Sequence, residues 1–137
     1  MLKKPTPHLA LGRRGEDAAA AILLRAGMHI LDRNWREGRL ELDLVCKDGD
    51  TVVFVEVKTR ATAGRGGPEG ALTQAKRRSL SRAAQAWLAA HEAWDTPCRF
   101  DVVALVACDG TFSAEHYRHA FDFAPSLDSG HAPWQPW

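Results

Sequence analysis

The stretch that most constrains this chain is 51–60, an apolar run of β-branched and aromatic residues into which Glu56 and Lys58 are inserted. Such a run is typical of a buried strand. Because side chains alternate faces along a strand, Glu56 and Lys58 share one face with Phe54. Charges in an apolar strand cost free energy unless they are paired or bind a metal ion. Two interpretations follow, an ion pair at a fraying strand end or a functional site.

The preceding stretch favours the second interpretation. Residues 39–46 alternate leucines with acidic residues, which predicts a strand, and Asp48-Gly49 is a hairpin signal between the two strands. A turn centred on that dipeptide places Asp43 opposite Phe54. Asp43 is then a diagonal neighbour of Glu56, at roughly 7–8 Å, on the same face of the sheet.

Two carboxylates on one face call for a cation between them. At about 6 Å and an effective dielectric near 20, they repel by about 3 kcal/mol. Lys58 supplies part of the compensation and a divalent cation could supply more. Mg²⁺, or Mn²⁺ in its place, is held by one or two carboxylates, waters and substrate phosphate oxygens. The pattern therefore indicates phosphodiester hydrolysis, with Asp43 and Glu56 as metal ligands and Lys58 orienting water or stabilising charge.

The spacing of these residues is similar to a known nuclease signature. Asp43, then twelve residues, then Glu56-Val57-Lys58 resembles the PD-(D/E)XK signature of restriction-endonuclease-like nucleases. With its surroundings, the chain resembles the YraN family, small bacterial proteins of unassigned function related to archaeal Holliday-junction resolvases. The segments that carry the resemblance are 12–16, 34–36, 41–45, 54–60, 76–78 and 99–103. Leu40 departs from the family, which usually has glycine there; this could alter the backbone near the site but removes no ligand.

The resemblance implies a fold, an activity and further ligands. The implied fold is an α/β, restriction-endonuclease-like core, a mixed β-sheet flanked by helices in the order αβββαβ. The implied activity is Mg²⁺-dependent cleavage of structured or branched DNA, and a homodimer is expected because junction resolvases act as dimers. Glu16 is expected to be a third acidic metal ligand; from the residues alone it suits the first turn of a helix over 12–25.

Two other functions stay open. One is a nucleic-acid-binding module that keeps the fold with little or no turnover, and the other is a structural ion-pair network with an interaction role. Glu41 and Gln74 are candidate supporting groups behind the ligands, although Glu41 could equally be solvated at the sheet edge. Gln74 and Lys76 are expected to face the site, as the corresponding region does in the resembled family.

The distribution of charge favours a polyanionic partner. The formal net charge is only +1, but residues 57–82 carry seven Lys and Arg against Glu69 alone. Basic side chains beside a carboxylate site suit a nucleic acid, because phosphate contacts supply most non-specific affinity. A solvated helix face is the alternative for any one of them. The candidate nucleic-acid-binding residues are Arg13, Arg14, Arg60, Lys76, Arg77 and Arg78.

Length and composition indicate a single domain. Residues 1–11 are expected to form a flexible arm, 12–121 the nuclease-like domain, and 122–137 a tail containing two tryptophans. The absence of eighteen consecutive apolar residues predicts no membrane span. The three cysteines, Cys46, Cys98 and Cys108, are odd in number and lack metal-ligand spacing. They indicate buried free thiols in a reducing cytosol, and hence a cytoplasmic protein.

The remaining elements follow from periodicity and turn signals. Expected strands cover 28–35, 98–108 and, at the sheet edge, 111–121. A glycine-rich loop is expected over 61–68 and a second helix from 71 or 73 to 93. Asp101 beside Arg99 is interpreted as a structural ion pair, and His116 and His119 as too divergent on a strand to share a metal.

Overall fold

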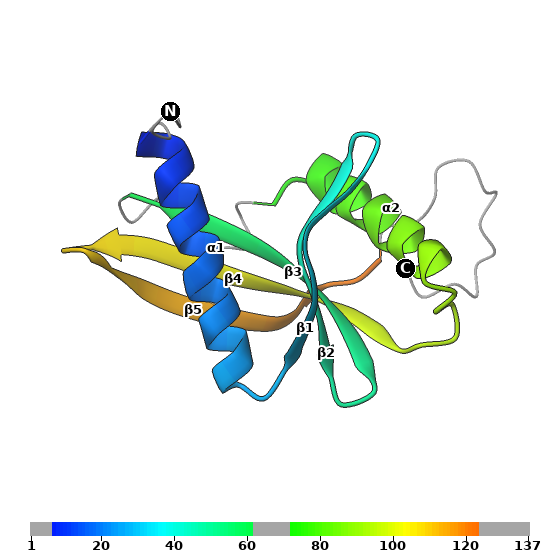
Figure 1. The fold of residues 1–137 in the computed structure, drawn as a ribbon. Helices are drawn as coiled ribbons and strands as arrows, with labels where there is room; N and C mark the ends of the chain where they lie inside the picture. Colours follow the sequence, from blue (N-terminus) through cyan, green and yellow to red (C-terminus); the bar gives the residue numbers. More distant parts are fainter. Residues whose placement is uncertain (1–6, 62–71, 124–137) are drawn as a thin grey trace, which may run out of the picture.

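The computed structural model describes residues 7–61 and 72–123. In chain order its elements are α1 (Pro7–Arg25), β1 (His29–Glu37), β2 (Leu40–Asp48), β3 (Thr51–Arg60), α2 (Gln74–Ala90), β4 (Cys98–Cys108) and β5 (Thr111–Phe121) (Figure 1). The strands form one sheet in the order β1-β2-β3-β4-β5. Strands β3 and β4 are parallel and the other pairs antiparallel, so the predicted mixed α/β sheet is confirmed. None of the helices in the described part is long and apolar enough to cross a membrane.

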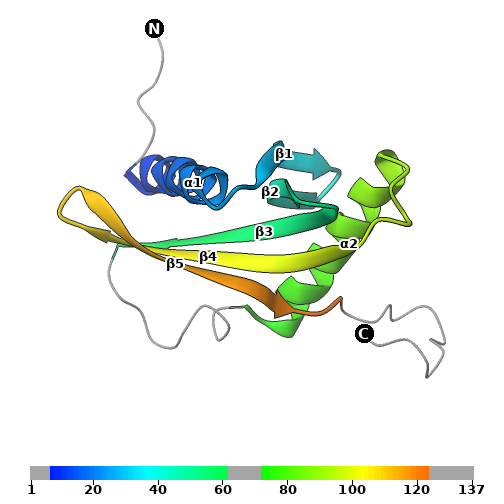
Figure 2. The same ribbon diagram turned by 90° about the horizontal axis from the view of Figure 1, so that it is seen from below.

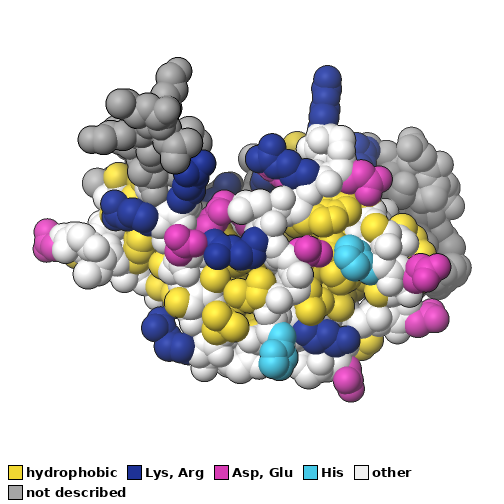
Figure 3. Space-filling view, viewed as in Figure 1, with side chains coloured by type: hydrophobic (Ala, Val, Ile, Leu, Met, Phe, Trp, Pro, Cys, Tyr) yellow, Lys and Arg dark blue, Asp and Glu magenta, His cyan; other side chains and the backbone are white. Residues whose placement is uncertain are grey.

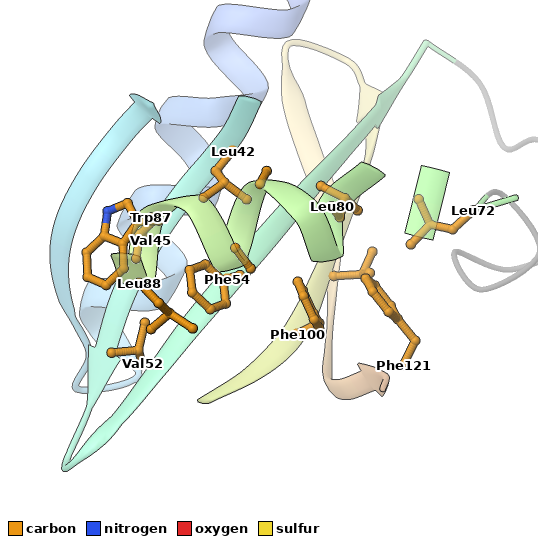
Figure 4. Packing of buried hydrophobic residues seen from close by; sticks show 13 residues of the cluster. Leu42, Val45, Val52, Phe54, Leu72, Leu80, Trp87, Leu88, Phe100 and Phe121 are labelled. Carbon is orange, nitrogen blue, oxygen red and sulfur yellow. The ribbon is translucent and has the colours of Figure 1, made fainter. Parts of the chain in front are cut away.

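The two helices cover opposite faces of the sheet, and β3 is buried between them. Figure 2 shows α1 on one side of the strands and α2 on the other. Val52 and Phe54 pack into the cluster beneath α2 (Figure 4). Val53 and Val55 pack into the cluster beneath α1. The Phe54 ring meets Trp87 of α2 edge-on, with centroids 5.9 Å apart. Helix α2 is also the crossover that a parallel β3–β4 pair requires.

Helix α1 begins earlier than the sequence predicts. A flexible arm over 1–11 was expected because its prolines were interpreted as blocking a helix, but α1 starts at Pro7. Proline is favoured at the first helical position, where its fixed φ suits the helix and the missing N–H is not needed. The expected arm is therefore wrong for 7–11, and residues 1–6 lie outside the described part.

The end of α1 is fixed by Gly27, as predicted. Gly27 has φ +91°. Its N–H donates to the carbonyl of Leu24 at 3.0 Å, and the N–H of Met28 donates to that of Leu23 at 3.1 Å. These are the two hydrogen bonds of a Schellman motif. Met28 and Leu23 are both buried in the cluster beneath α1, the apolar contact that accompanies the motif.

Most other boundaries agree with the prediction. Strands β3, β4 and β5 have the predicted bounds, and β1 and β2 differ by one or two residues at their ends. Helix α2 is capped by Thr73, whose side chain accepts from the N–H of Lys76 at 3.1 Å, and it ends three residues before the predicted 93. Residue 61 and residues 122–123 are described without regular structure. The rest of the expected glycine-rich loop and tail, within 62–71 and 124–137, lies outside the described residues.

The cysteines are less uniform than predicted. Cys46 is buried, and burial raises the pKa of its thiol to about 12. Cys98 is half-buried and Cys108, at the end of β4, is exposed. The expectation of buried thiols is therefore confirmed for Cys46 and wrong for Cys108.

The β2–β3 hairpin is shifted by one residue at its turn. Asp48 pairs with Thr51, so the two turn residues are Gly49 and Asp50 and not Asp48 and Gly49. Glycine stands at the first central position with φ +61°, as a type II′ turn requires. In consequence Val45 pairs with Phe54, the residue that was predicted to face Asp43. The shift is two residues along the ladder, an even number, so the residues of β2 that pair with β3, from Leu44 to Asp48, keep their predicted faces.

Strand β2 bends at Asp43, which the sequence did not predict. Leu42 and Leu44 were expected on one face, but Leu42 packs beneath α2 and Leu44 beneath α1. Pairing with β3 is described only as far as Leu44–Val55. On the other side, between the pairs Arg33–Leu44 and Trp35–Leu42, Asn34 of β1 has a left-handed φ of 51°. Both strands of the β1–β2 hairpin change direction here, which leaves Asp43 at a gap beside β3.

Candidate functional site

The Asp43 side chain fills the gap that the bend of β2 leaves beside β3. Its Oδ2 accepts a hydrogen bond from the N–H of Val57 at 2.8 Å. The carboxylate thus takes the acceptor role that a backbone carbonyl of a straight β2 would have taken. This bond fixes Asp43 against the residue that follows Glu56, so the two carboxyl groups are brought together.

Asp43 and Glu56 form a hydrogen-bonded acid pair. Burial raises the pKa of Asp43 to about 8, helped by the hydrogen bond to Glu56 and by the charge of that neighbour. The Val57 N–H and the charge of Lys76 act in the opposite direction on the same pKa. The raised pKa of Asp43 favours a form in which the two carboxyls share one proton.

Glu56 has one carboxylate oxygen without a hydrogen bond. The residue is only 7% exposed, and its Oε2 has no hydrogen-bond partner among the residues that the structure describes. Lys76 Nζ lies 3.4 Å from that oxygen. A buried oxygen left without a hydrogen bond is costly, and in native proteins it commonly marks the place of a water or an ion. Two adjoining carboxyls, one with a free lone pair, fit the donor set that Mg²⁺ takes from proteins.

The structure gives the two candidate lysines different surroundings. Lys58 lies two residues after Glu56 on β3 and is half-buried, but it forms no ion pair with any other described residue. Lys76, in the first turn of α2, is the cation that pairs with Glu56. Lys76 therefore lies beside one of the two predicted acids. From the sequence, Lys76 was predicted to bind phosphate. Its contact with Glu56 was not predicted, because the distance between the two side chains depends on how α2 packs on the sheet.

Glu16 lies by a neighbouring pocket. A hollow of about 360 Å³ between α1 and β3 is lined by Leu11, Gly12, Glu16, Asp43, Val57, Thr59 and Ala61. Glu16 was predicted to lie in the first turn of α1, but it lies nine residues after the start of that helix. It shares the hollow with Asp43. Within 7–61 and 72–123, however, no three His, Cys, Asp or Glu side chains lie close enough together to hold a metal.

Gly15 brings α1 close to β3 at this hollow. A Cβ added to Gly15 would lie 2.1 Å from Thr59 Oγ1, far inside van der Waals contact. Glycine inside a helix costs about 1 kcal/mol relative to alanine, so a mid-helix glycine signals a tight approach. Gly15 belongs to the segment 12–16 that carries the family resemblance, and its close approach to β3 was not predicted from the sequence. The structure makes it the residue that lets Glu16 reach the hollow beside Asp43.

The predicted basic residues differ in exposure and in contacts. Figure 3 shows acidic side chains in a hollow between α1 and the β1–β2 hairpin, with Lys and Arg on its sides. Arg13 and Arg14 are exposed on α1, and the Arg14 guanidinium lies 5.5 Å from the ring of Phe112. Arg77 lies at the same distance over the ring of Phe121. Arg60 and Arg78 are half-buried.

The two candidate supporting groups lie at the surface. Glu41 is exposed and its Oε2 lies 3.4 Å from Arg36 Nη2, which corresponds to the solvated alternative. Gln74 is the first residue of α2 and is also exposed.

Asp101 forms a second cluster at the far strands. It is fully buried and accepts hydrogen bonds from Arg99 Nε at 2.9 Å, the His119 N–H at 2.9 Å and His116 Nε2 at 2.8 Å. Burial alone would raise the pKa of Asp101, but these bonds together lower it. The predicted structural ion pair with Arg99 is confirmed. The His119 ring turns away to Asp122, so the two histidines do not share a site.

A second hollow is mostly apolar. It has a volume of about 430 Å³ and is lined by Gln85, Leu88, Trp94, Cys98, Arg99, Phe100, His119, Phe121, Asp122 and Phe123. Its charged groups, Arg99 and Asp122, are already paired with Asp48, Asp101 and His119. The acid pair of Asp43 and Glu56 is therefore the better candidate for chemistry.

Comparison with known proteins identifies relatives along most of the chain. A family model described as "Uncharacterised protein family UPF0102" matches residues 15–105. A "UPF0102 protein" of Nitratidesulfovibrio vulgaris is 55% identical over 128 residues, covering 93% of this chain and 96% of the relative. "UPF0102 protein LI0223" of Lawsonia intracellularis is 47% identical, with the same coverage. "UPF0102 protein GSU0650" of Geobacter sulfurreducens is 49% identical, covering 83% of this chain and 90% of the relative.

Among solved structures, the chain is similar to "The structure of Pyrococcus Furiosus SfsA in complex with Ca2+". The similarity covers 81% of this chain and 63% of the other, at 15% identity and a TM-score of 0.38. A similarity of that size carries no argument about fold or function.

Proposed function

The chain belongs to the uncharacterised protein family UPF0102, and we propose that it is a metal-dependent endonuclease that hydrolyses phosphodiester bonds in structured or branched DNA. The observation that carries the proposal is the buried acid pair of Asp43 and Glu56, with an oxygen of Glu56 left without a hydrogen bond. A buried carboxyl pair with an oxygen that lacks a hydrogen bond destabilises the fold, and a bound cation would compensate for that cost.

The architecture supports a restriction-endonuclease-like core. The elements follow the order αβββαβ with a fifth strand added, and the acid pair stands on the two neighbouring strands β2 and β3. This is the arrangement that the resemblance of Asp43 and Glu56-Val57-Lys58 to the PD-(D/E)XK signature implies. The bend of β2 brings the two carboxyls together, and Asp43 lines the hollow between α1 and β3.

Each side chain has a role in this proposal. Asp43 and Glu56 would hold Mg²⁺ or Mn²⁺, which supplies Lewis-acid stabilisation of the developing charge and lowers the pKa of water. The Val57 N–H holds the Asp43 carboxyl in place through Oδ2. Glu16 would act from the adjoining hollow, through water. Lys58 would orient the attacking water or stabilise the phosphate, as charged donors do in preorganised sites.

Exposed and half-buried basic residues would bind the DNA backbone. They are Arg13, Arg14, Arg60, Lys76, Arg77 and Arg78. The resemblance to junction resolvases supports branched DNA as the substrate and a homodimer as the acting form. We propose the cytoplasm as the place of action, where DNA is accessible and free cysteines stay reduced.

Cleavage assays with matched variants test the proposal. The full chain is incubated with duplex, single-stranded and four-way-junction DNA in Mg²⁺ or Mn²⁺. We expect metal-dependent cleavage that falls at least about 100-fold in Glu56→Gln, Asp43→Asn and Lys58→Met. Glu41→Gln is the control, because it neutralises an exposed carboxylate on the same strand as Asp43. Equal rates in Glu56→Gln and wild type would refute the assigned site.

A DNA-binding module without turnover is the second candidate. It is favoured by the described residues in one respect, since they contain no group of three metal-ligating side chains. This candidate predicts salt-dependent binding to DNA with no cleavage in any metal, and binding that Glu56→Gln leaves unchanged. Binding that ignores salt would count against both candidates.

A further inference from the structure

Lys76 is held in place before its side chain reaches the acid pair. It is the third residue of α2, and its N–H donates to the side chain of the N-cap residue Thr73 at 3.1 Å. This bond fixes the first helical turn, the part of α2 that carries the lysine. The half-buried side chain then spans from α2 to β3, where its Nζ lies 3.4 Å from Glu56 Oε2.

The ammonium group points at the oxygen that a metal ion would need. Glu56 Oε2 is a buried oxygen that has no hydrogen bond to any described residue, and the Lys76 ammonium lies 3.4 Å from it. The charge of Lys76 also acts on Asp43, lowering its pKa against the effect of burial. Lys76 thus lies within electrostatic reach of both carboxyls. Lys58, on the strand itself, forms no ion pair with another described residue.

We propose that Lys76 is an internal counter-ion. In the metal-free protein its ammonium occupies the place beside Glu56 Oε2 where a divalent cation would bind, and it must leave when that cation binds. The inference rests on the proposed function, since it places the metal at the Asp43–Glu56 pair. A lysine and a divalent cation cannot both approach one carboxylate oxygen without strong repulsion. Its displacement would free the ammonium, on the first turn of α2, to meet a DNA phosphate. Lys76 would then be a positioning residue that couples metal binding to substrate binding.

Manganese affinity in the absence of DNA tests this competition. Binding of Mn²⁺ to the full chain is followed by electron paramagnetic resonance of the free ion and by calorimetry. In Lys76→Met we expect affinity at least about tenfold tighter than wild type, because the competing charge is gone. Lys76→Arg keeps the charge and should bind within about threefold of wild type. Arg82→Met is the matched control, since it deletes an exposed positive charge on the same helix.

The outcomes separate this inference from the proposed function. Tighter binding in Lys76→Met, with Lys76→Arg and Arg82→Met near wild type, supports it. Unchanged or weaker binding in Lys76→Met overturns it and leaves the nuclease proposal standing if Glu56→Gln abolishes Mn²⁺ binding. Tightening in Lys58→Met alone overturns it in favour of the strand lysine. If no variant binds Mn²⁺ at millimolar concentration, both the inference and the metal-dependent function fail. Far-ultraviolet circular dichroism and thermal unfolding confirm that each variant is folded.

Discussion

Asp43 is a residue whose ionisation opposes folding. Burial first, and then the hydrogen bond and charge of Glu56, raise its pKa from the ordinary 3.8 to about 8. An acid with a raised folded-state pKa favours the native state when it is protonated. That stability is complete below the unfolded pKa and is lost as the pH rises toward the folded pKa. In the absence of a divalent cation, the chain should therefore lose stability between about pH 4 and pH 8 through this one carboxyl.

The substitution Asp43→Asn tests this pH dependence. The amide oxygen can still accept from the Val57 N–H, but the side chain carries no proton to lose. In EDTA at pH 8 we expect the free energy of unfolding to exceed that of wild type by about 1–3 kcal/mol, with little difference at pH 4. Urea unfolding at both pH values measures it. Glu41→Gln, at an exposed position, should show no such pH-dependent gain. A difference between Asp43→Asn and wild type that is the same at both pH values would contradict the assignment.

At the scale of the elements, the site depends on how closely α1 approaches β3. Gly15 faces Thr59 with no room for a Cβ, whereas a Cβ at Gly12 would meet nothing within 4 Å. Both glycines lie inside α1, so both weaken the helix by a similar amount. The two positions therefore separate the intrinsic preference of the helix from the packing of the helix on the sheet.

We expect opposite effects from alanine at these two positions. Gly12→Ala should raise the free energy of unfolding by about 0.5–1 kcal/mol through helix propensity. Gly15→Ala should lower it by about 1–3 kcal/mol, because α1 must move away from Thr59. Thermal and urea unfolding measure both changes. Adding Thr59→Ala, which removes the nearest atom, should recover part of the loss in Gly15→Ala. Stabilisation by Gly15→Ala alone would show that the contact does not constrain the helix.

The elements themselves were largely predictable because their signals are local. The strand over 51–60 is a continuous apolar run, and Gly27 and Thr73 give the stop and start that helix ends require. The bend at Asp43 was not predictable in this way. Both faces of β2 are covered by a helix, so leucines at 42 and 44 satisfy either a straight strand or one that changes faces. The alternation pattern carries no information about which occurs.

The candidate site was predictable only in part, for the same reason. Asp43 and Glu56 were expected near each other on neighbouring strands, and they do lie together, but the bend at Asp43 and the hydrogen bond to the Val57 N–H bring them there. The ion pair of Lys76 with Glu56 depends on the packing of α2 across the sheet. So does the position of Glu16, which depends on where α1 begins and how closely Gly15 lets it approach. Distances between elements are set by tertiary packing, which periodicity does not encode.

For the molecule as a whole, the net charge of +1 hides an uneven distribution. Acidic side chains are seen in the hollow between α1 and the β1–β2 hairpin, and Lys and Arg lie at its sides (Figure 3). A polyanion would be attracted by these Lys and Arg side chains, which form the rim of the hollow. It would be repelled by the acidic side chains unless a cation neutralised the acids. DNA binding should therefore depend on salt through the basic residues and on a divalent cation through the acid pair.

The salt dependence of DNA affinity measures how many of the basic side chains contact phosphates. If three to five of the six candidate basic residues contact phosphates, the logarithm of the association constant should fall with the logarithm of salt concentration with a slope of roughly −3 to −5. The double variant Arg13→Ala, Arg14→Ala should reduce that slope by about two, since both side chains are exposed on α1. Fluorescence anisotropy with a four-way junction, in the cleavage-impaired Glu56→Gln background, measures it without turnover. Arg25→Ala, an exposed charge at the far end of the same helix, is the control and should leave the slope within about 0.5 of its parent. An equal effect from Arg25→Ala would show that the attraction depends on net charge alone. It would contradict the proposed role of the basic residues in DNA binding.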